Sequence, residues 1–181
     1  MKWSKGVIAR LVARQTLASK CLLLVDRCNW TGNECDVLGV TQDLRIIDIE
    51  VKISRSDLKA DAKKDKWWHR LSYAEAQERG VDLWNHRDPV QHPRRVWKHY
   101  YAMPAEIWKP ELAACLPSTA SGILLARETR GGTLAVHCER RATPAKDAYR
   151  LKPEQVIDIA RLANLRMWDA FKALESAEVT S

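Results

Sequence analysis

The chain has 181 residues, of which 46% are hydrophobic and only 14 are Gly or Pro, which excludes a disordered protein and fits one domain with its own core. No apolar run approaches the roughly 20 residues that a membrane-spanning helix needs. The basic N-terminus lacks the apolar core of a secretory signal, and the five cysteines match no common zinc spacing, so we expect a cytoplasmic protein with reduced thiols.

The net charge of +7 is concentrated in two segments. Residues 1–20 contain five Lys or Arg and no acid, and residues 52–70 contain seven Lys or Arg against three Asp. Basic clusters of this kind suit a polyanion such as nucleic acid. A solubilising surface explains the same charges equally well, so charge alone leaves both interpretations open.

Hydrophobic periodicity predicts one helix and then three strands in the first part of the chain. The helix has its apolar residues on one face and Arg10 and Arg14 on the other. A Gly-Asn pair in residues 29–34 is typical of a hairpin turn between the first two strands. The expected elements are a helix at 5–19 and strands at 21–27, 35–41 and 44–53.

A second helix is predicted over residues 54–70, with Ser54 or Ser56 as its cap. Trp67 and Trp68 fall at its end, where buried packing is favoured over stacking on unpaired bases. Four basic residues recur along one side of this helix as a stripe that either follows a phosphate backbone or is a solvated face. They are Lys59, Lys63, Lys66 and Arg70.

Residues 72–96 are rich in Pro, Asn, Asp and His, and we expect a long loop or partly ordered insertion within the single domain 1–181. Its Arg94 and Arg95 are candidates for DNA contacts or for a partner surface. The remaining elements are a strand at 98–103, a short helix broken at Pro110, strands at 121–127 and 132–138, and a long helix from Pro153. This order predicts an α/β fold with a sheet flanked by helices.

The third strand has an unusual distribution of charge. Alternation places Ile47, Ile49, Val51 and Ile53 on one face, and Asp48, Glu50 and Lys52 on the other. A sheet covered by helices is normally apolar on both faces, so these charges need a counter-charge or a cation. If the strands at 35–41 and 44–53 form a hairpin, Asp36 falls close to Glu50.

Two explanations fit this charged face. Carboxylates on neighbouring strands with a lysine beside them are able to hold Mg²⁺ and activate a water. Alternatively, the strand faces solvent and its charges form cross-strand ion pairs. No phosphate-binding glycine loop, serine nucleophile motif or HExxH zinc motif is present, which disfavours those enzyme classes.

Asp36, followed by IEVK at 49–52 and a helix, resembles the signature of the PD-(D/E)XK nuclease superfamily, whose core order α-β-β-β-α-β fits residues 5–103. The chain is more closely similar to the MmcB-like DNA repair family and related phage-borne proteins. That similarity covers roughly residues 20–170 and rests on the strings ECDVLGV, DIEVKISRSDLKADAKKDKWW, HYYAMP, SGILLA and RLANLRMW.

This resemblance implies a restriction-endonuclease-like core and a deoxyribonuclease, an endonuclease rather than an exonuclease, that acts on DNA in repair or in phage DNA metabolism. Asp36, Glu50 and the carbonyl of Val51 would bind Mg²⁺ or Mn²⁺. Lys52 would orient the water and steady the scissile phosphate. The location it implies is the cytoplasm of a bacterial or phage-infected cell.

The chain also departs from the superfamily pattern. Many members take a further Glu from the first helix, whereas residues 1–20 contain no acid, so two alternatives are open: a minimal metal site, or substitution by Glu34 or Asp48. Relatives of the MmcB type tend to carry a basic residue near position 34. Asp57 and Asp61 are supporting candidates, with a helix cap and an exposed ion pair as their alternative roles.

Three functions are therefore open. The first is a metal-dependent DNA nuclease, the second a catalytically inactive nucleic-acid-binding module of the same fold, and the third a protein-interaction factor that uses residues 72–96. A nuclease requires Asp36, Glu50 and Lys52 to converge at an open groove, whereas splayed or ion-paired side chains favour the second function. No membrane partner is expected, and a homodimer is left open.

Overall fold

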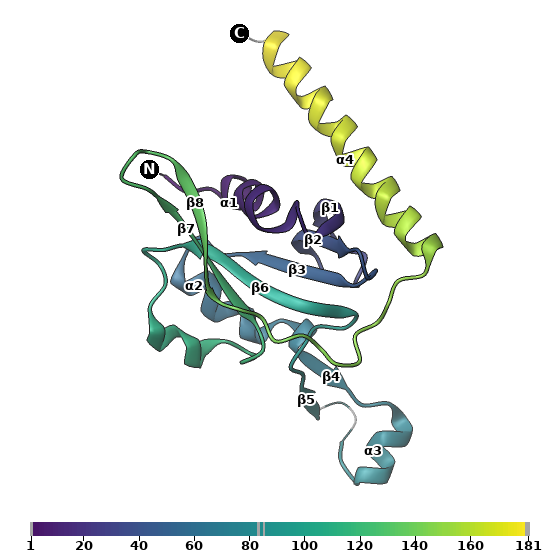
Figure 1. Cartoon of the computed structure of the whole chain (residues 1–181). Coiled ribbons are helices and arrows are strands. Elements are labelled where there is room, and N and C mark those ends of the chain that lie inside the picture. Colours follow the sequence, from purple (N-terminus) through teal and green to yellow (C-terminus); the bar gives the residue numbers. More distant parts are fainter. Residues whose placement is uncertain (1, 83, 85, 180–181) are drawn as a thin grey trace.

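The computed structural model describes residues 2–82, 84 and 86–179 and contains a six-stranded mixed sheet with helices on both faces (Figure 1). The strands of this sheet are β1 (Cys21–Cys28), β2 (Cys35–Thr41), β3 (Ile46–Val51), β6 (Val96–Pro104), β7 (Gly122–Glu128) and β8 (Leu134–Arg140). The α-helices are α1 (Lys5–Val12), α2 (Arg55–Ala60), α3 (Tyr73–Arg79) and α4 (Pro153–Val179). The predicted α/β class is confirmed. No helix in these residues is long and apolar enough to cross a membrane.

The sheet has the strand order β1-β2-β3-β6-β7-β8. β1, β2 and β3 form an antiparallel meander, β6 and β7 continue the sheet parallel to β3, and β8 returns antiparallel to β7. Val37 pairs with Ile49, and Leu38 pairs with Asp48. Continuing this register by one residue places Asp36 beside Glu50, so the predicted hairpin is confirmed.

The two faces of β3 differ as the alternation predicts. Ile47, Ile49 and Val51 pack with Ile8 and Val12 of α1 in one apolar cluster. The opposite face carries the charged residues, between an apolar cluster beneath the start of α4 and another beneath α2. Helices α1 and α2 lie on opposite sides of the sheet (Figure 1). The charged residues are therefore inside the protein rather than on a solvent-facing strand.

The predicted helix over 54–70 is wrong beyond Ala60. α2 ends there and is followed by two 3-10 turns, η2 (Asp61–Lys63) and η3 (Asp65–Trp67), and by the short strand β4 (Trp68–Arg70). Lys64 between the two turns is extended, with ψ of 140°. This path turns Lys66 and Trp67 into the interior. Only Lys59, Lys63 and Arg70 of the predicted basic stripe stay exposed, so the stripe as a single face is also wrong.

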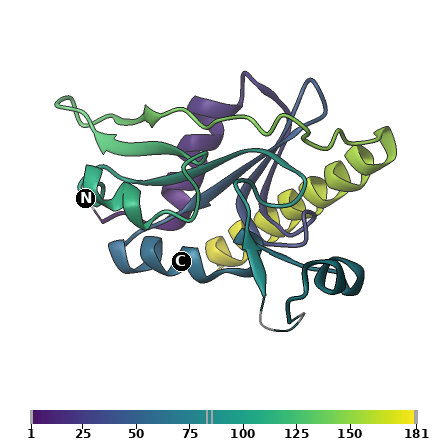
Figure 2. The same ribbon diagram turned by 90° about the horizontal axis from the view of Figure 1, so that it is seen from below.

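The segment 72–96 has more local structure than its composition indicates. α3 begins with a capping box between Ser72 and Glu75, and β5 (Arg87–Pro89) pairs with β4. This unit projects away from the main sheet near the start of β6 (Figures 1 and 2). Residues 83 and 85 of the predicted insertion lie outside the described residues. Further along, Pro110 begins the 3-10 helix η4 (Pro110–Cys115) instead of breaking a longer helix.

Gly122 at the start of β7 is required by close packing against β6. A Cβ atom at this position would lie 2.3 Å from the Tyr100 ring and 2.7 Å from the backbone nitrogen of Ala142. We expect Gly122→Ala to lower the free energy of unfolding by about 1–3 kcal/mol, because ring and backbone must both shift. Urea unfolding measures this loss. Gly131→Ala is the matched control, since nothing lies within 4 Å of a Cβ there, and an equal loss in both variants would contradict the argument.

Candidate functional site

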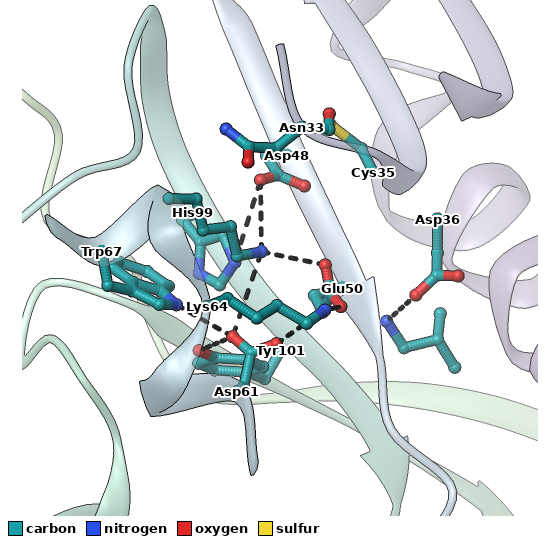
Figure 3. A network of polar contacts seen from close by, with 12 residues as sticks. Asn33, Cys35, Asp36, Asp48, Glu50, Asp61, Lys64, Trp67, His99 and Tyr101 are labelled. Atoms are coloured by element: carbon teal, nitrogen blue, oxygen red, sulfur yellow. Dashed lines mark hydrogen bonds and ion pairs between the residues drawn. The ribbon is translucent and has the colours of Figure 1, made fainter. Parts of the chain in front are cut away.

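Glu50 is the centre of a buried network of opposite charges on β3. Its side chain is 4% exposed, and its Oε1 accepts hydrogen bonds from Lys52 Nζ at 3.0 Å and from Lys64 Nζ. Its Oε2 accepts from Lys66 Nζ at 2.9 Å. Both carboxylate oxygens are therefore in contact with ammonium groups (Figure 3).

Asp61 in η2 is the second buried carboxylate of the network, with a fully buried side chain. It accepts hydrogen bonds from Lys52 Nζ at 2.7 Å, from Trp67 Nε1 at 2.9 Å and from Tyr101 Oη at 2.6 Å. Lys64 Nζ lies 2.9 Å away. Asp61 thus connects β3, β6 and the turns after α2 through one side chain, which explains why the chain abandons the helix at this point.

These contacts shift the pKa of Glu50, Asp61 and Lys66. Burial alone would raise the pKa of Glu50 and Asp61, but Lys66 and Lys52 overcome that effect and hold both below their ordinary values. Burial would lower the pKa of Lys66, yet Asp48, Asp61 and Glu50 raise it. The network therefore contains ionised carboxylates and ionised lysines at neutral pH, which satisfy each other in place of water.

Asp48 is the carboxylate of the network whose charge is least compensated by nearby cations. Its Oδ2 is 3.9 Å from Lys66 Nζ and 3.9 Å from His99 Nε2, and its Oδ1 is buried without a hydrogen-bond partner. Burial raises its pKa to about 6. Burial, followed by the charge of Lys66, lowers the pKa of His99 well below its ordinary value, so His99 is neutral. His99 Nδ1 lies 3.0 Å from Ser121 Oγ.

Asp36 does not join this ammonium network. Its Oδ2 accepts a hydrogen bond from the backbone N–H of Val51 at 2.7 Å (Figure 3). Its Oδ1 is 3.8 Å from Lys5 Nζ. Burial raises its pKa against the opposing effects of the Val51 bond and Lys5. The register brings Asp36 beside Glu50 as predicted, but the two carboxylates have different partners.

The other predicted residues lie around this centre. Asp57 is 3.7 Å from Lys52 Nζ and its side chain is 35% exposed, so it is a peripheral member of the network. Glu34 is exposed in the turn before β2. Arg95 packs on the rings of Trp30 and Tyr149, at 5.0 and 5.8 Å from their centroids. Arg95 is therefore engaged with aromatic rings of the chain.

The donor set does not fit a bound Mg²⁺ or Mn²⁺ in this arrangement. A divalent ion prefers carboxylate oxygens and water, whereas both oxygens of Glu50 already accept from lysines. Asp36 is bonded to the N–H of Val51, the residue whose carbonyl was expected to be a ligand. Within residues 2–82, 84 and 86–179, no group of three or more His, Cys, Asp or Glu side chains is placed to hold a metal ion.

A basic groove of about 480 Å³ opens beside the network, between the segment around β4 and the start of β6. Arg70 and Arg94 line it together with Trp68, a residue that is 37% exposed. Asp65 is the acidic residue in the lining of the groove. Its carboxylate forms ion pairs with Arg70 at 3.4 Å and with Arg87 at 3.0 Å. The lining residues are Asn33, Asp65, Lys66, Trp68, His69, Arg70, Val90, His92 and Arg94.

Sequence reasoning missed Lys64, Trp67, His99 and Tyr101 as members of the network. His99 and Tyr101 lie two residues apart on β6, which is the spacing of a shared strand face. They are register neighbours of Asp48 and Glu50 on the parallel strand β3. Alternation in residues 98–103 was therefore a usable signal, although it required knowledge that β3 and β6 are adjacent.

Comparisons with known proteins identify a fold and no function. No protein-family model matches the chain, and no curated protein matches it. A solved structure of a protein of unknown function, SPO1766 from Silicibacter pomeroyi, is similar with a TM-score of 0.56 and 22% sequence identity. The match covers 98% of this chain and 96% of the other, so the likeness extends over the whole fold.

Removing the charge of Asp61 tests the network. We expect Asp61→Asn to lower the free energy of unfolding at pH 7 by about 3 kcal/mol or more, because Lys52 loses one of its two buried carboxylate partners. The pKa of Asp61 is below its ordinary value of 3.8, so its contribution is present above pH 4 and is lost as the pH falls below that value. Urea unfolding at pH 7 and pH 3 should show the difference shrinking at pH 3. Asp65→Asn, at a side chain 65% exposed, is the control, and equal effects would contradict the assignment.

Asp48 should show the opposite dependence on pH. Its pKa of about 6 exceeds its ordinary value of 3.8, so its contribution to stability is present below pH 4 and is lost as the pH rises through 6. Asp48→Asn cannot ionise, so its stability relative to wild type should improve by roughly 3 kcal/mol between pH 4 and pH 7. Urea unfolding across this range measures the change, with the exposed Asp43→Asn as control. A difference in the free energy of unfolding between Asp48→Asn and wild type that does not change with pH would refute the prediction.

Proposed function

We propose that this protein binds nucleic acid through the basic groove, on a restriction-endonuclease-like scaffold whose D…ExK residues are neutralised by lysines. The observation that carries the proposal is the groove itself, in which Arg70, Arg94 and the exposed Trp68 converge beside the network. Arginines are suited to phosphate oxygens, and an exposed indole is suited to stacking on a base.

The strand arrangement supports the scaffold part of this proposal. Apart from the β4–α3–β5 unit, which is inserted between α2 and β6, α1 is followed by the meander β1-β2-β3, then by α2, and then by β6 parallel to β3. This is the α-β-β-β-α-β order of the PD-(D/E)XK core, and Glu50 and Lys52 fall at the end of its third strand. The scaffold therefore accounts for the sequence resemblance without requiring that the residues be catalytic.

The ion pairs favour binding over hydrolysis. Lys52 is buried and shared between two carboxylates, so it is not free to orient a water at a phosphate. The groove contains Lys66 but does not reach Asp36, Glu50 or Lys52. The residues that the resemblance assigns to catalysis therefore lie in the interior, whereas the arginines and Trp68 are accessible to a polymer.

A metal-dependent DNA nuclease is the second candidate function, and one observation favours it. Asp36 and Glu50 lie opposite each other on neighbouring strands, and Lys64, which contacts Glu50 Oε1, is 46% exposed. An exposed lysine is more easily displaced than a buried one. DNA is the partner in both candidates, and Mg²⁺ or Mn²⁺ is the cofactor only in the second.

Binding is tested with labelled single-stranded, double-stranded and branched DNA over a series of salt concentrations. Arg94→Ala should weaken binding about tenfold and reduce the slope of log K against log salt by about 1, because one phosphate contact is lost. Trp68→Ala should weaken binding to single strands with little change in the salt slope. Arg130→Ala, in the exposed β7–β8 turn, removes the same charge away from the groove and serves as control. Binding that neither groove variant weakens would sink the proposal.

The same samples, incubated with Mg²⁺ or Mn²⁺, separate the two candidate functions. We expect wild-type protein to bind DNA without cleaving it under either metal. Asp36→Asn is the informative variant, since Asp36 lies outside the ammonium network and its loss should leave the fold and DNA binding intact. Cleavage by wild type that Asp36→Asn abolishes would establish the nuclease and overturn the binding-only proposal.

A further inference from the structure

A second cavity, of about 700 Å³, lies on the other face of the sheet. It is enclosed by the end of the α1 segment, the β2–β3 turn, β6 and the chain after β8. Lys98 and Tyr100 of β6 point to this face, because their neighbours His99 and Tyr101 belong to the buried network on the opposite one. The cavity, called here the α1-face pocket, is therefore separate from the basic groove.

Three cations line the α1-face pocket: Lys20, Lys98 and Arg141. Among the described residues, none of the three has an acidic partner within 4.0 Å, although Asp43 is also part of the lining. Lys98 is half-buried, and its pKa is lowered first by burial and then by the charges of Lys20 and Arg141. Lys98 is thus close enough to Lys20 and Arg141 to be repelled by both, and an anion beside Lys98 would offset that cost.

The remainder of the pocket suits a planar organic group. Lys98 Nζ lies 4.3 Å from the centroid of the Trp97 ring, so the indole and a cation line the same wall. Thr16 and Ser19 add hydroxyl groups at the α1 side. The volume is within the range of 300–1,000 Å³ that is typical of small-molecule sites, and sites of that kind combine apolar walls with a few convergent polar groups.

We propose that the α1-face pocket binds a free nucleotide. The phosphates contact Lys20, Lys98 and Arg141, and the base packs on Trp97. A solubilising surface is the competing explanation of these cations, but such a surface leaves its lysines extended in water, whereas Lys98 is half-buried beside an indole. This inference is independent of the proposed DNA binding, because the two sites share no lining residue.

Isothermal titration calorimetry with ATP, AMP, inorganic pyrophosphate and adenosine tests the proposal. We expect ATP to bind most tightly, and adenosine to bind at least about tenfold more weakly than AMP, because it lacks the phosphate. Lys98→Met and Arg141→Gln should each weaken both ATP and pyrophosphate about tenfold. Trp97→Leu should weaken ATP more than pyrophosphate, since ATP loses the contact of its base with the indole, whereas pyrophosphate loses only the contact by which that ring positions Lys98.

The controls keep this result distinct from DNA binding. Arg94→Ala in the basic groove should bind ATP as wild type does, and circular dichroism should show that every variant is folded. The absence of ATP and AMP binding, or binding that both Lys98→Met and Arg141→Gln leave unchanged, would overturn the proposal. Tighter Lys98-dependent binding of a 5′-phosphorylated oligonucleotide than of ATP would also overturn it, because the pocket would then be a polymer end site.

Discussion

The fold depends on the compensation of charge between β3 and the turns after α2. Glu50 and Lys52 lie on a covered sheet face between two apolar clusters, and each would be strongly unfavourable there alone. Asp61 and Lys66 satisfy them, but only if the chain leaves the helix after Ala60 and turns inward. The η2 and η3 turns and the burial of Trp67 follow from this requirement, because the indole N–H is one of the donors to Asp61.

The same compensation bears on function. A lysine and a divalent cation compete for the same carboxylate oxygens, and a buried lysine held by two carboxylates is difficult to displace. Lys66, with a side chain 2% exposed, therefore weighs against a metal at Glu50 more strongly than the half-exposed Lys64 does. The resemblance to a nuclease signature is carried by Asp36, Glu50 and Lys52, whereas the observation that weighs against metal binding comes from Lys66, a residue outside that D…ExK pattern.

Alternation was sufficient to predict the two faces of β3 and the position of Asp36 beside Glu50, because a strand has only two faces and a hairpin fixes the register. The segment 54–70 could not be predicted in the same way. Lys59, Lys63 and Lys66 have helical spacing, and no neighbouring residue in the sequence indicates that Lys66 is the buried one. Its burial depends on Glu50, sixteen residues away, and tertiary contacts of this kind override local propensity. His99 and Tyr101 of β6 could not be predicted for a related reason, since the sequence of one strand does not show which other strand lies next to it.

Lysines on the two faces of the sheet differ in whether they are paired with carboxylates. This difference is the reason to propose different roles for the two faces. On the α2 face, each buried lysine contacts a carboxylate, so the charges stabilise the fold and have little capacity left for a ligand. On the α1 face, Lys98 is half-buried near two other cations and contacts the Trp97 ring, and among the described residues no carboxylate lies within 4.0 Å of Lys20, Lys98 or Arg141. Charges that serve the fold are paired within it, whereas uncompensated charges in a cavity lower stability unless a ligand supplies the opposite sign. This criterion supports the proposals that the ExK strand has a structural role and that the cations of the α1-face pocket bind a ligand.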